Sequence, residues 1–165
     1  MLSKTMQDAI NEQIKNEFYS AYLYLSMSAY FESINMPGSA KWMRTQFGEE
    51  QTHGLKMFDF IHDRGGRIAL KAIDAPAVDF ASPVAVWEMV LAHEQKVTGL
   101  INKLYAQAVT ENDYASQTFL TWFITEQVEE EQWSGELMSL MEQFHGHPGQ
   151  LFMLDHQWGK RVKAS

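Results

Sequence analysis

Cysteine is absent from this chain of 165 residues, and proline is scarce, with four residues. The lack of cysteine excludes disulfide frameworks, thiolate zinc sites, cysteine-ligated iron–sulfur clusters and a cysteine nucleophile. Any metal must therefore be bound by oxygen atoms and imidazole. No apolar run approaches the roughly 20 residues that span a membrane, and residues 1–13 are polar, unlike a signal peptide. We therefore expect a soluble, cytoplasmic protein without a membrane partner.

Basic residues are also few, since 13 Lys and Arg stand against 21 Asp and Glu and give a formal net charge of −8. This acidic balance disfavours nucleic acid or an anionic membrane as a partner and favours cations. The length suits one domain, and 45% apolar residues suffice for a hydrophobic core. We predict that residues 1–165 form a single domain.

Helix breakers are sparse and clustered, so the chain divides into long segments rich in Ala, Leu, Met, Glu, Gln and Lys. This distribution predicts an all-α protein with a four-helix bundle over about residues 5–145. The stretch 66–83 has no helical stripe and is long enough to cross over along the bundle. Ser82 and Asp113 are expected to cap the third and fourth helices. The breaks fall at residues 35–38, 65–66, 112–113 and 146–149.

Each of the four segments carries a line of apolar residues at helical spacing, which an acid or amide interrupts near its middle. A single glutamate on such a line is usually an edge residue, but the same interruption in four segments indicates a shared site. Carboxylates without partners in a bundle core are costly and repel one another, so the cluster should protonate or bind a cation. The interrupting residues are Glu17, Glu50, Glu94, Gln127 and Glu130.

His53 follows Glu50 by three residues, and this Glu-x-x-His unit is a known bundle device for iron or manganese. The two halves of the chain match at an offset of 77 positions, which aligns Glu50 with Gln127 and His53 with Glu130. A symmetric dimetal bundle would repeat Glu-x-x-His, whereas the second half offers Gln-x-x-Glu. We therefore expect two metal positions of different affinity.

Oxygen-rich ligands with one imidazole favour divalent iron or manganese, although zinc would also bind, and iron has the useful oxygen chemistry. Tyr24 lies two turns after Glu17 on the same stripe. Its phenol could reach a ligand or supply an electron, or it could be a hydrogen-bonded core tyrosine, and both interpretations stay open. Trp122 is expected to pack rather than to act in redox chemistry.

A second acidic set, Glu49, Glu126 and Glu129, flanks the first. Such runs are most often solvated helix faces, but these residues adjoin the predicted ligands, so a looser third cation site is an open alternative. The remaining histidines match no ligand spacing and are expected at the surface: His62, His93, His145, His147 and His156.

Taken together, these residues resemble the non-haem bacterial ferritins over essentially the whole chain. The resemblance is carried by residues 11–13 leading to 17–20, the segment 49–53, Glu94 and the segment 126–131. It implies a ferritin-like four-helix bundle with a long crossover between helices 2 and 3, followed by a short fifth helix over about residues 150–159.

The same resemblance implies a residue-by-residue assignment of iron sites. The implied ligands of the first iron are Glu17, Glu50 and His53. Those of the second iron are Glu50, Glu94 and Glu130, with Gln127 close by, so that Glu50 bridges the two ions. The implied third site comprises Glu49, Glu126 and Glu129, with Glu130 shared, and the implied redox tyrosine is Tyr24.

The implied function is iron storage with ferroxidase activity. Fe(II) would be oxidised by dioxygen or hydrogen peroxide at the paired site within each subunit and stored as ferric oxyhydroxide inside a homo-oligomeric shell of 24 subunits. Bacterioferritins bind haem through a methionine at the position of Gln51, so no haem is expected here. Gln117 and Leu120 stand where animal ferritins carry pore carboxylates, which favours iron entry through the subunit toward the third site.

Two other classes of protein compete with this interpretation. A di-iron peroxidase or electron-transfer protein of the rubrerythrin type is disfavoured by the absence of cysteine and by Glu130 at the place of a second histidine. A metal-free helical interaction module is disfavoured by the four interrupted stripes.

Overall fold

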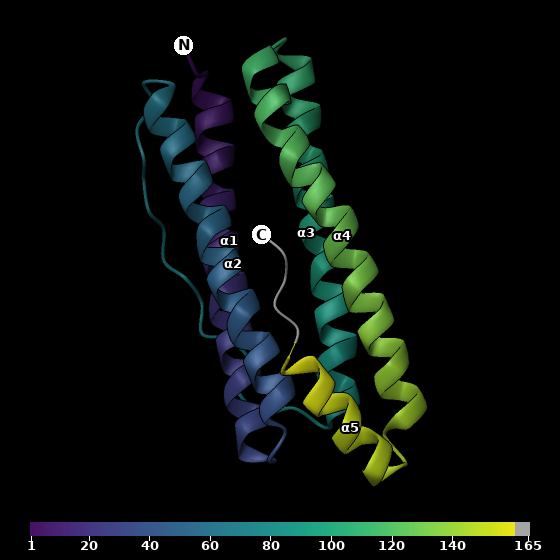
Figure 1. Ribbon diagram of the computed structural model, residues 1–165. Helices are drawn as coiled ribbons and strands as arrows, with labels where there is room; N and C mark the ends of the chain where they lie inside the picture. Colours follow the sequence, from purple (N-terminus) through teal and green to yellow (C-terminus); the bar gives the residue numbers. More distant parts are fainter. Residues whose placement is uncertain (161–165) are drawn as a thin grey trace.

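Five helices make up most of the described chain. A computed structural model describes residues 1–160, and this range contains no strand. The elements in chain order are α1 (Lys4–Ser33), α2 (Pro37–Asp63), α3 (Pro83–Thr110), α4 (Tyr114–Phe144) and α5 (Pro148–Trp158). As Figure 1 shows, α1 pairs with α2, α3 pairs with α4, and α5 lies across one end of the bundle. The predicted all-α bundle is confirmed, with α5 beginning at Pro148 rather than at about residue 150.

Three helices end where the sequence predicts breaks, because a residue there takes the left-handed conformation. Asn35, Gly65 and Asn112 have φ values of 58°, 69° and 55°. In each turn two backbone N–H groups return to carbonyls of the preceding helix, as Met36 does to Phe31 at 2.9 Å. These are Schellman motifs, in which Gly and Asn are the residues that best tolerate a positive φ.

The predicted helix caps are confirmed, and they set where the second pair of helices begins. The Ser82 hydroxyl accepts a hydrogen bond from the backbone N–H of Ala85, and the Asp113 carboxylate accepts one from Ser116. The stretch between α2 and α3 contains no helix and runs along the outside of the bundle in Figure 1, as expected for a crossover. No helix in residues 1–160 is long and apolar enough to cross a membrane.

A buried carboxylate joins α5 to the start of α2. Asp155 accepts hydrogen bonds from the backbone N–H groups of Gly38 and Ser39, at 2.8 and 2.7 Å, and from the Ser39 hydroxyl at 2.7 Å. The N-cap residue of α2, Met36, provides no side-chain hydrogen bond, so Asp155 takes that role. The backbones approach so closely that a Cβ on Gly38 would lie 1.6 Å from the Asp155 carbonyl oxygen.

The apolar core is divided into two clusters by a polar layer. One cluster lies toward α5 and includes Phe31, Met43 and Trp87, and the other lies at the opposite end and includes Ile10 and Phe123. Between them the stripes of all four long helices carry polar side chains that are at most 5% exposed. These are Glu17, Glu50, His53, Glu94, Gln127 and Glu130.

Candidate metal centre

Glu17 of α1 and the Glu50–His53 pair of α2 converge in the polar layer. Each offers one ligand atom, and these atoms all lie within 4.8 Å of one another. The Nδ1 atom of His53 is 3.9 Å from a Glu17 oxygen and 3.7 Å from a Glu50 oxygen. Residues three apart on a helix share a face, so α2 presents both its ligands to α1. Within residues 1–160, this is the one group of three or more acidic or histidine side chains gathered this closely.

Glu94 of α3 and Glu130 of α4 lie in the same layer but outside that group, and each accepts hydrogen bonds from an amide. Gln127 donates to a Glu94 carboxylate oxygen at 3.2 Å, and Gln46 donates to Glu130 at 3.0 Å. The Tyr24 hydroxyl also donates to Glu94. The structure therefore places the two acids of the implied second site opposite the first group, with amide and phenol donors holding them in position.

Burial and mutual repulsion weaken the acidity of these carboxyl groups. Burial raises the pKa of Glu17 from 4.5 to about 8, with a further contribution from the Glu50 charge. Burial raises the pKa of Glu94 to about 7, with a contribution from Glu130. The pKa of Glu50 is raised well above its ordinary value by burial and then by Glu94 and Glu130. A cluster of acids that resist ionisation in the apolar core is the environment that a bound cation relieves.

Tyr24 faces Glu94 rather than Glu17. Its ring is 1% exposed and meets Trp42 and His93 edge-on, at centroid distances of 6.2 and 6.4 Å. Burial, followed by the Glu94 charge, raises the pKa of its phenol well above 10, so the hydroxyl keeps its proton and donates a hydrogen bond to the carboxylate. The prediction that this phenol could reach a ligand residue agrees with the geometry.

His93 is half-buried, and the expectation that it lies at the surface is wrong. Its Nε2 atom lies 2.7 Å from the Ser20 hydroxyl, and its ring packs near Tyr19. Burial lowers the pKa of this imidazole to about 4, with a smaller contribution from Lys96. Position 93 is one residue away from the apolar stripe, so the stripe gave no signal of its burial. The other four, His62, His145, His147 and His156, are exposed as expected.

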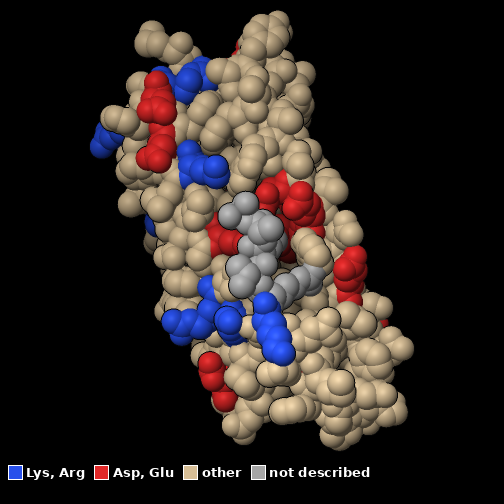
Figure 2. Space-filling model, viewed as in Figure 1, with Lys and Arg blue, Asp and Glu red and all other residues tan. Residues whose placement is uncertain are grey.

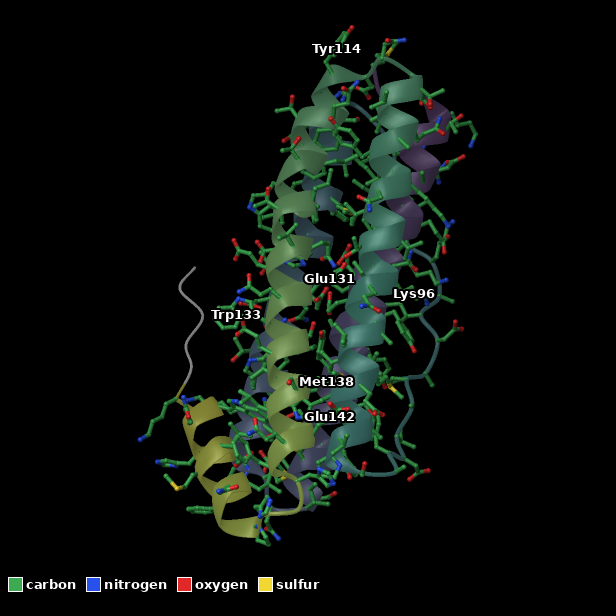
Figure 3. All side chains as sticks on the ribbon, turned by 90° about the vertical axis from the view of Figure 1, so that its right-hand side faces the viewer. Lys96, Tyr114, Glu131, Trp133, Met138 and Glu142 are labelled. Carbon is green, nitrogen blue, oxygen red and sulfur yellow. The ribbon has the colours of Figure 1, made fainter. Side chains whose placement is uncertain are left out.

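The acids of the implied third site lie at the edge of the layer. Glu49 and Glu126 are half-buried and Glu129 is exposed, and they form no three-ligand group within the described residues. In Figure 2, acidic side chains gather near the middle of the face that α2 and α4 form. Seen from the α3–α4 side, side-chain oxygens lie between the helices at about the height of the labelled Glu131 (Figure 3).

Sequence reasoning missed several neighbours of the ligands. Gln13 donates to Glu17 at 2.7 Å, and both Gln13 and Gln46 stand four residues before a predicted ligand, which is a usable signal. Trp122 is 39% exposed, and its ring lies edge-on to His53 at 5.4 Å with the Lys56 ammonium 4.3 Å from its centroid.

A bundle of two helix pairs, joined by a long crossover around a buried Glu/His layer, defines a ferritin-like protein. The family described as "Ferritin-like domain" matches residues 7–144. The chain belongs to the ferritin family, as the resemblance predicts.

Two relatives called bacterial non-heme ferritin match nearly the full length. That of Bacteroides fragilis (strain 638R) is 41% identical over 161 residues, which cover 98% of this chain and 100% of the relative. That of Staphylococcus aureus (strain USA300) is 34% identical over 162 residues, with 98% of each chain covered. An open pore ferritin of the archaeon Archaeoglobus fulgidus superposes with a TM-score of 0.97 at 42% identity, covering 98% of this chain and 100% of that one.

Proposed function

We propose that this protein stores iron and oxidises it on entry, with Fe(II) as the substrate of a ferroxidase centre. The observation that carries the proposal is the buried group of Glu17, Glu50 and His53, whose ligand atoms lie within 4.8 Å of one another. Two carboxylates and one imidazole suit divalent iron. The relatives called bacterial non-heme ferritin support iron as the cargo.

Each carboxylate of the layer has a proposed role. The first Fe(II) binds Glu17, Glu50 and His53, and the second binds Glu50, Glu94 and Glu130. Glu50 bridges the pair, and two-metal sites generally hold their ions about 3.5–4 Å apart. The four carboxylates, once deprotonated, carry four negative charges, which balance two divalent ions.

Ion binding must displace protons, because the raised pKa values keep Glu17 largely protonated and Glu94 partly protonated near neutral pH. Oxidation then needs two electrons for each dioxygen that is reduced to hydrogen peroxide. Each Fe(II) supplies one electron, and two protons complete the peroxide. With hydrogen peroxide as oxidant, two electrons and two protons give two water molecules.

The two iron positions are proposed to differ in affinity. The first has an imidazole, whereas the second has carboxylates alone, with the Gln127 amide already hydrogen-bonded to Glu94 at 3.2 Å. The third site, Glu49, Glu126 and Glu129, is proposed as a looser station on the iron route through the subunit. Its partly exposed acids lie on α2 and α4, beside the buried ligands.

Assembly into a hollow shell of 24 subunits is proposed as the means of storage, with ferric oxyhydroxide in the cavity. The structural similarity to the Archaeoglobus fulgidus ferritin supports an assembly of this family. Measurement of the particle mass by size-exclusion chromatography with light scattering tests this part separately. A monomer or dimer would contradict it.

Aerobic Fe(II) titration of the metal-free protein tests the oxidation step. We expect Fe(III) to form faster than in buffer, and we expect the double variant Glu50→Ala with His53→Ala to reduce the rate to that of buffer. Glu88→Gln is a matched control, because Glu88 is an exposed acid on α3. Equal rates in the wild type and the double variant would contradict the proposal.

A further inference from the structure

Aromatic rings in contact form a line that starts at Tyr24 and leads away from the metal centre. The centroid distances are 6.2 Å from Tyr24 to Trp42, 4.9 Å from Trp42 to Trp87 and 4.8 Å from Trp87 to Trp158. The four side chains come from α1, α2, α3 and α5, so each step crosses to another helix. All four are at most 7% exposed. The line thus connects the phenol that donates to Glu94 with the helix across the bundle end.

Trp87 is poorly explained as a filler of the core. It is 0% exposed, and its Nε1 is the one buried side-chain nitrogen or oxygen in the described part of the chain without a hydrogen-bond partner. A buried N–H of this kind costs about 1–3 kcal/mol, which a phenylalanine would avoid. In a chain of electron-transfer steps, the lack of a hydrogen-bond acceptor for this N–H has a functional explanation. An oxidised indole that cannot release its proton stays a radical cation, which the next ring readily reduces.

The line ends beside a pocket where a small molecule can approach. Trp158 lines this pocket of about 410 Å³ between α4 and α5, together with Leu137, Leu154 and the charged residues Glu136 and Lys160. Trp158, at the far end of the line, is thus 3% exposed and lines the pocket, whereas Trp87 is completely enclosed.

We propose that Tyr24, Trp42, Trp87 and Trp158 form an electron-transfer chain that carries oxidising equivalents from the metal centre to the α4–α5 pocket. This inference rests on the proposed ferroxidase function. It gives the protein a means of discharging a strong oxidant when the centre holds a single Fe(II).

Hydrogen peroxide, the oxidant of that case, takes two electrons, and one Fe(II) supplies only one. Tyr24 gives the second, and its phenol proton passes along the hydrogen bond to Glu94. With two protons from solvent, Fe(II), peroxide and the tyrosine yield Fe(III), a tyrosyl radical, protonated Glu94 and two water molecules. The radical then takes an electron from Trp42 and recovers its proton from Glu94, which leaves an indole radical cation.

Two further electron transfers carry the oxidising equivalent from Trp42 to Trp158. Trp42 is reduced by Trp87, and Trp87 is reduced by Trp158, with no proton moved at Trp87. At the pocket, a small one-electron reductant such as ascorbate returns Trp158 to its resting state and is itself oxidised to its radical.

Freeze-quench electron paramagnetic resonance tests the chain. Protein with deuterated tryptophan is loaded anaerobically with one Fe(II) per subunit and mixed with hydrogen peroxide, and deuteration assigns each radical to tryptophan or tyrosine. The variants are Trp42→Phe and Trp87→Phe, each checked for native helicity and thermal unfolding. Trp122→Phe is the matched control, because Trp122 lies beside His53 but outside the line.

We expect a tryptophan radical in the wild type. Its decay should be at least tenfold faster with ascorbate than without it. Trp42→Phe should abolish this signal and lengthen the life of the tyrosyl radical, and Trp87→Phe should abolish its sensitivity to ascorbate. The control should keep both properties. A tryptophan signal unchanged in both chain variants, or lost in Trp122→Phe, would overturn the proposal and leave the line as packing.

An arm without iron separates this inference from the ferroxidase function. Azide radicals generated by pulse radiolysis oxidise tryptophan in the metal-free protein, and absorbance follows the transfer of this oxidising equivalent along the line to Tyr24. This direction is opposite to that in the iron-loaded protein, but the electronic coupling between the rings is the same both ways, so the experiment tests the line itself. We expect one intramolecular phase that is lost in both Tyr24→Phe and Trp42→Phe. If this phase is present but the protein does not oxidise Fe(II), the electron-transfer chain is supported and the ferroxidase function is contradicted. If the phase is absent in the wild type, the electron-transfer chain is contradicted, whether or not the protein oxidises Fe(II).

Discussion

Replacing Glu17 by glutamine should stabilise the metal-free protein, and the gain should grow as the pH rises. Burial, aided by the Glu50 charge, raises the pKa of Glu17 from 4.5 to about 8 in the folded chain. Between these values the unfolded chain has lost the proton and the folded chain keeps it. The folded state therefore binds more protons, and its stability falls with rising pH across this window.

The magnitude follows from the shift. Each pH unit within the window lowers the unfolding free energy by about 1.4 kcal/mol, so the cost of Glu17 reaches about 5 kcal/mol at about pH 8. Glutamine does not ionise and can still accept the hydrogen bond from Gln13. The difference in stability between the variant and the wild type should thus be small at about pH 5, rise toward about pH 8 and level off above it.

Denaturant unfolding of the chelator-treated proteins, followed by helical circular dichroism, measures this difference at several pH values. The other carboxylates are common to both proteins, and among them Glu50, which interacts directly with Glu17, is the one that the substitution also affects. Glu88→Gln, on the surface of α3, should give a curve parallel to the wild type. A Glu17→Gln curve that also runs parallel, or a difference that shrinks with rising pH, would refute the reasoning.

Three further outcomes are expected. Anaerobic Fe(II) binding should release protons, more at about pH 6 than at about pH 9, because Glu94 has a pKa raised to about 7; a pH-stat titration measures this release. Asp155→Ala should cost about 3 kcal/mol in denaturant unfolding and speed amide hydrogen exchange at Gly38, since two backbone donors lose their acceptor. Asn35→Ala should lower stability by about 1 kcal/mol relative to Asn35→Gly, because φ is 58° there; equal unfolding midpoints would contradict this.

The helices and the polar layer were predictable because both depend on local pattern. Breaks at Asn35 and Gly65 coincide with left-handed backbone, which these residue types favour, and the stripe interruptions at Glu17, Glu50 and Glu94 are buried as predicted. A period of about 3.6 residues suffices to place such residues on one face of a helix.

Contacts between distant segments left no such signal. The bond between Asp155 and the start of α2 joins residues 117 apart, and nothing in either segment specifies the other. The burial of His93 depends on Ser20 of another helix. The gathering of Glu17 with the α2 ligands, and the position of Glu94 outside that group, depend on how the helix pairs approach each other.

The hydrogen bonds between Asp155 and the start of α2 also have a consequence for synthesis on the ribosome. The first helix pair emerges early, but the N-terminal donors of α2 have no side-chain acceptor at Met36 and wait for a residue made 117 positions after Gly38. Contacts so distant in sequence form late, because closing the loop costs entropy before the bond contributes. The nascent α1–α2 pair should therefore fray at residues 37–39 until α5 has left the exit tunnel.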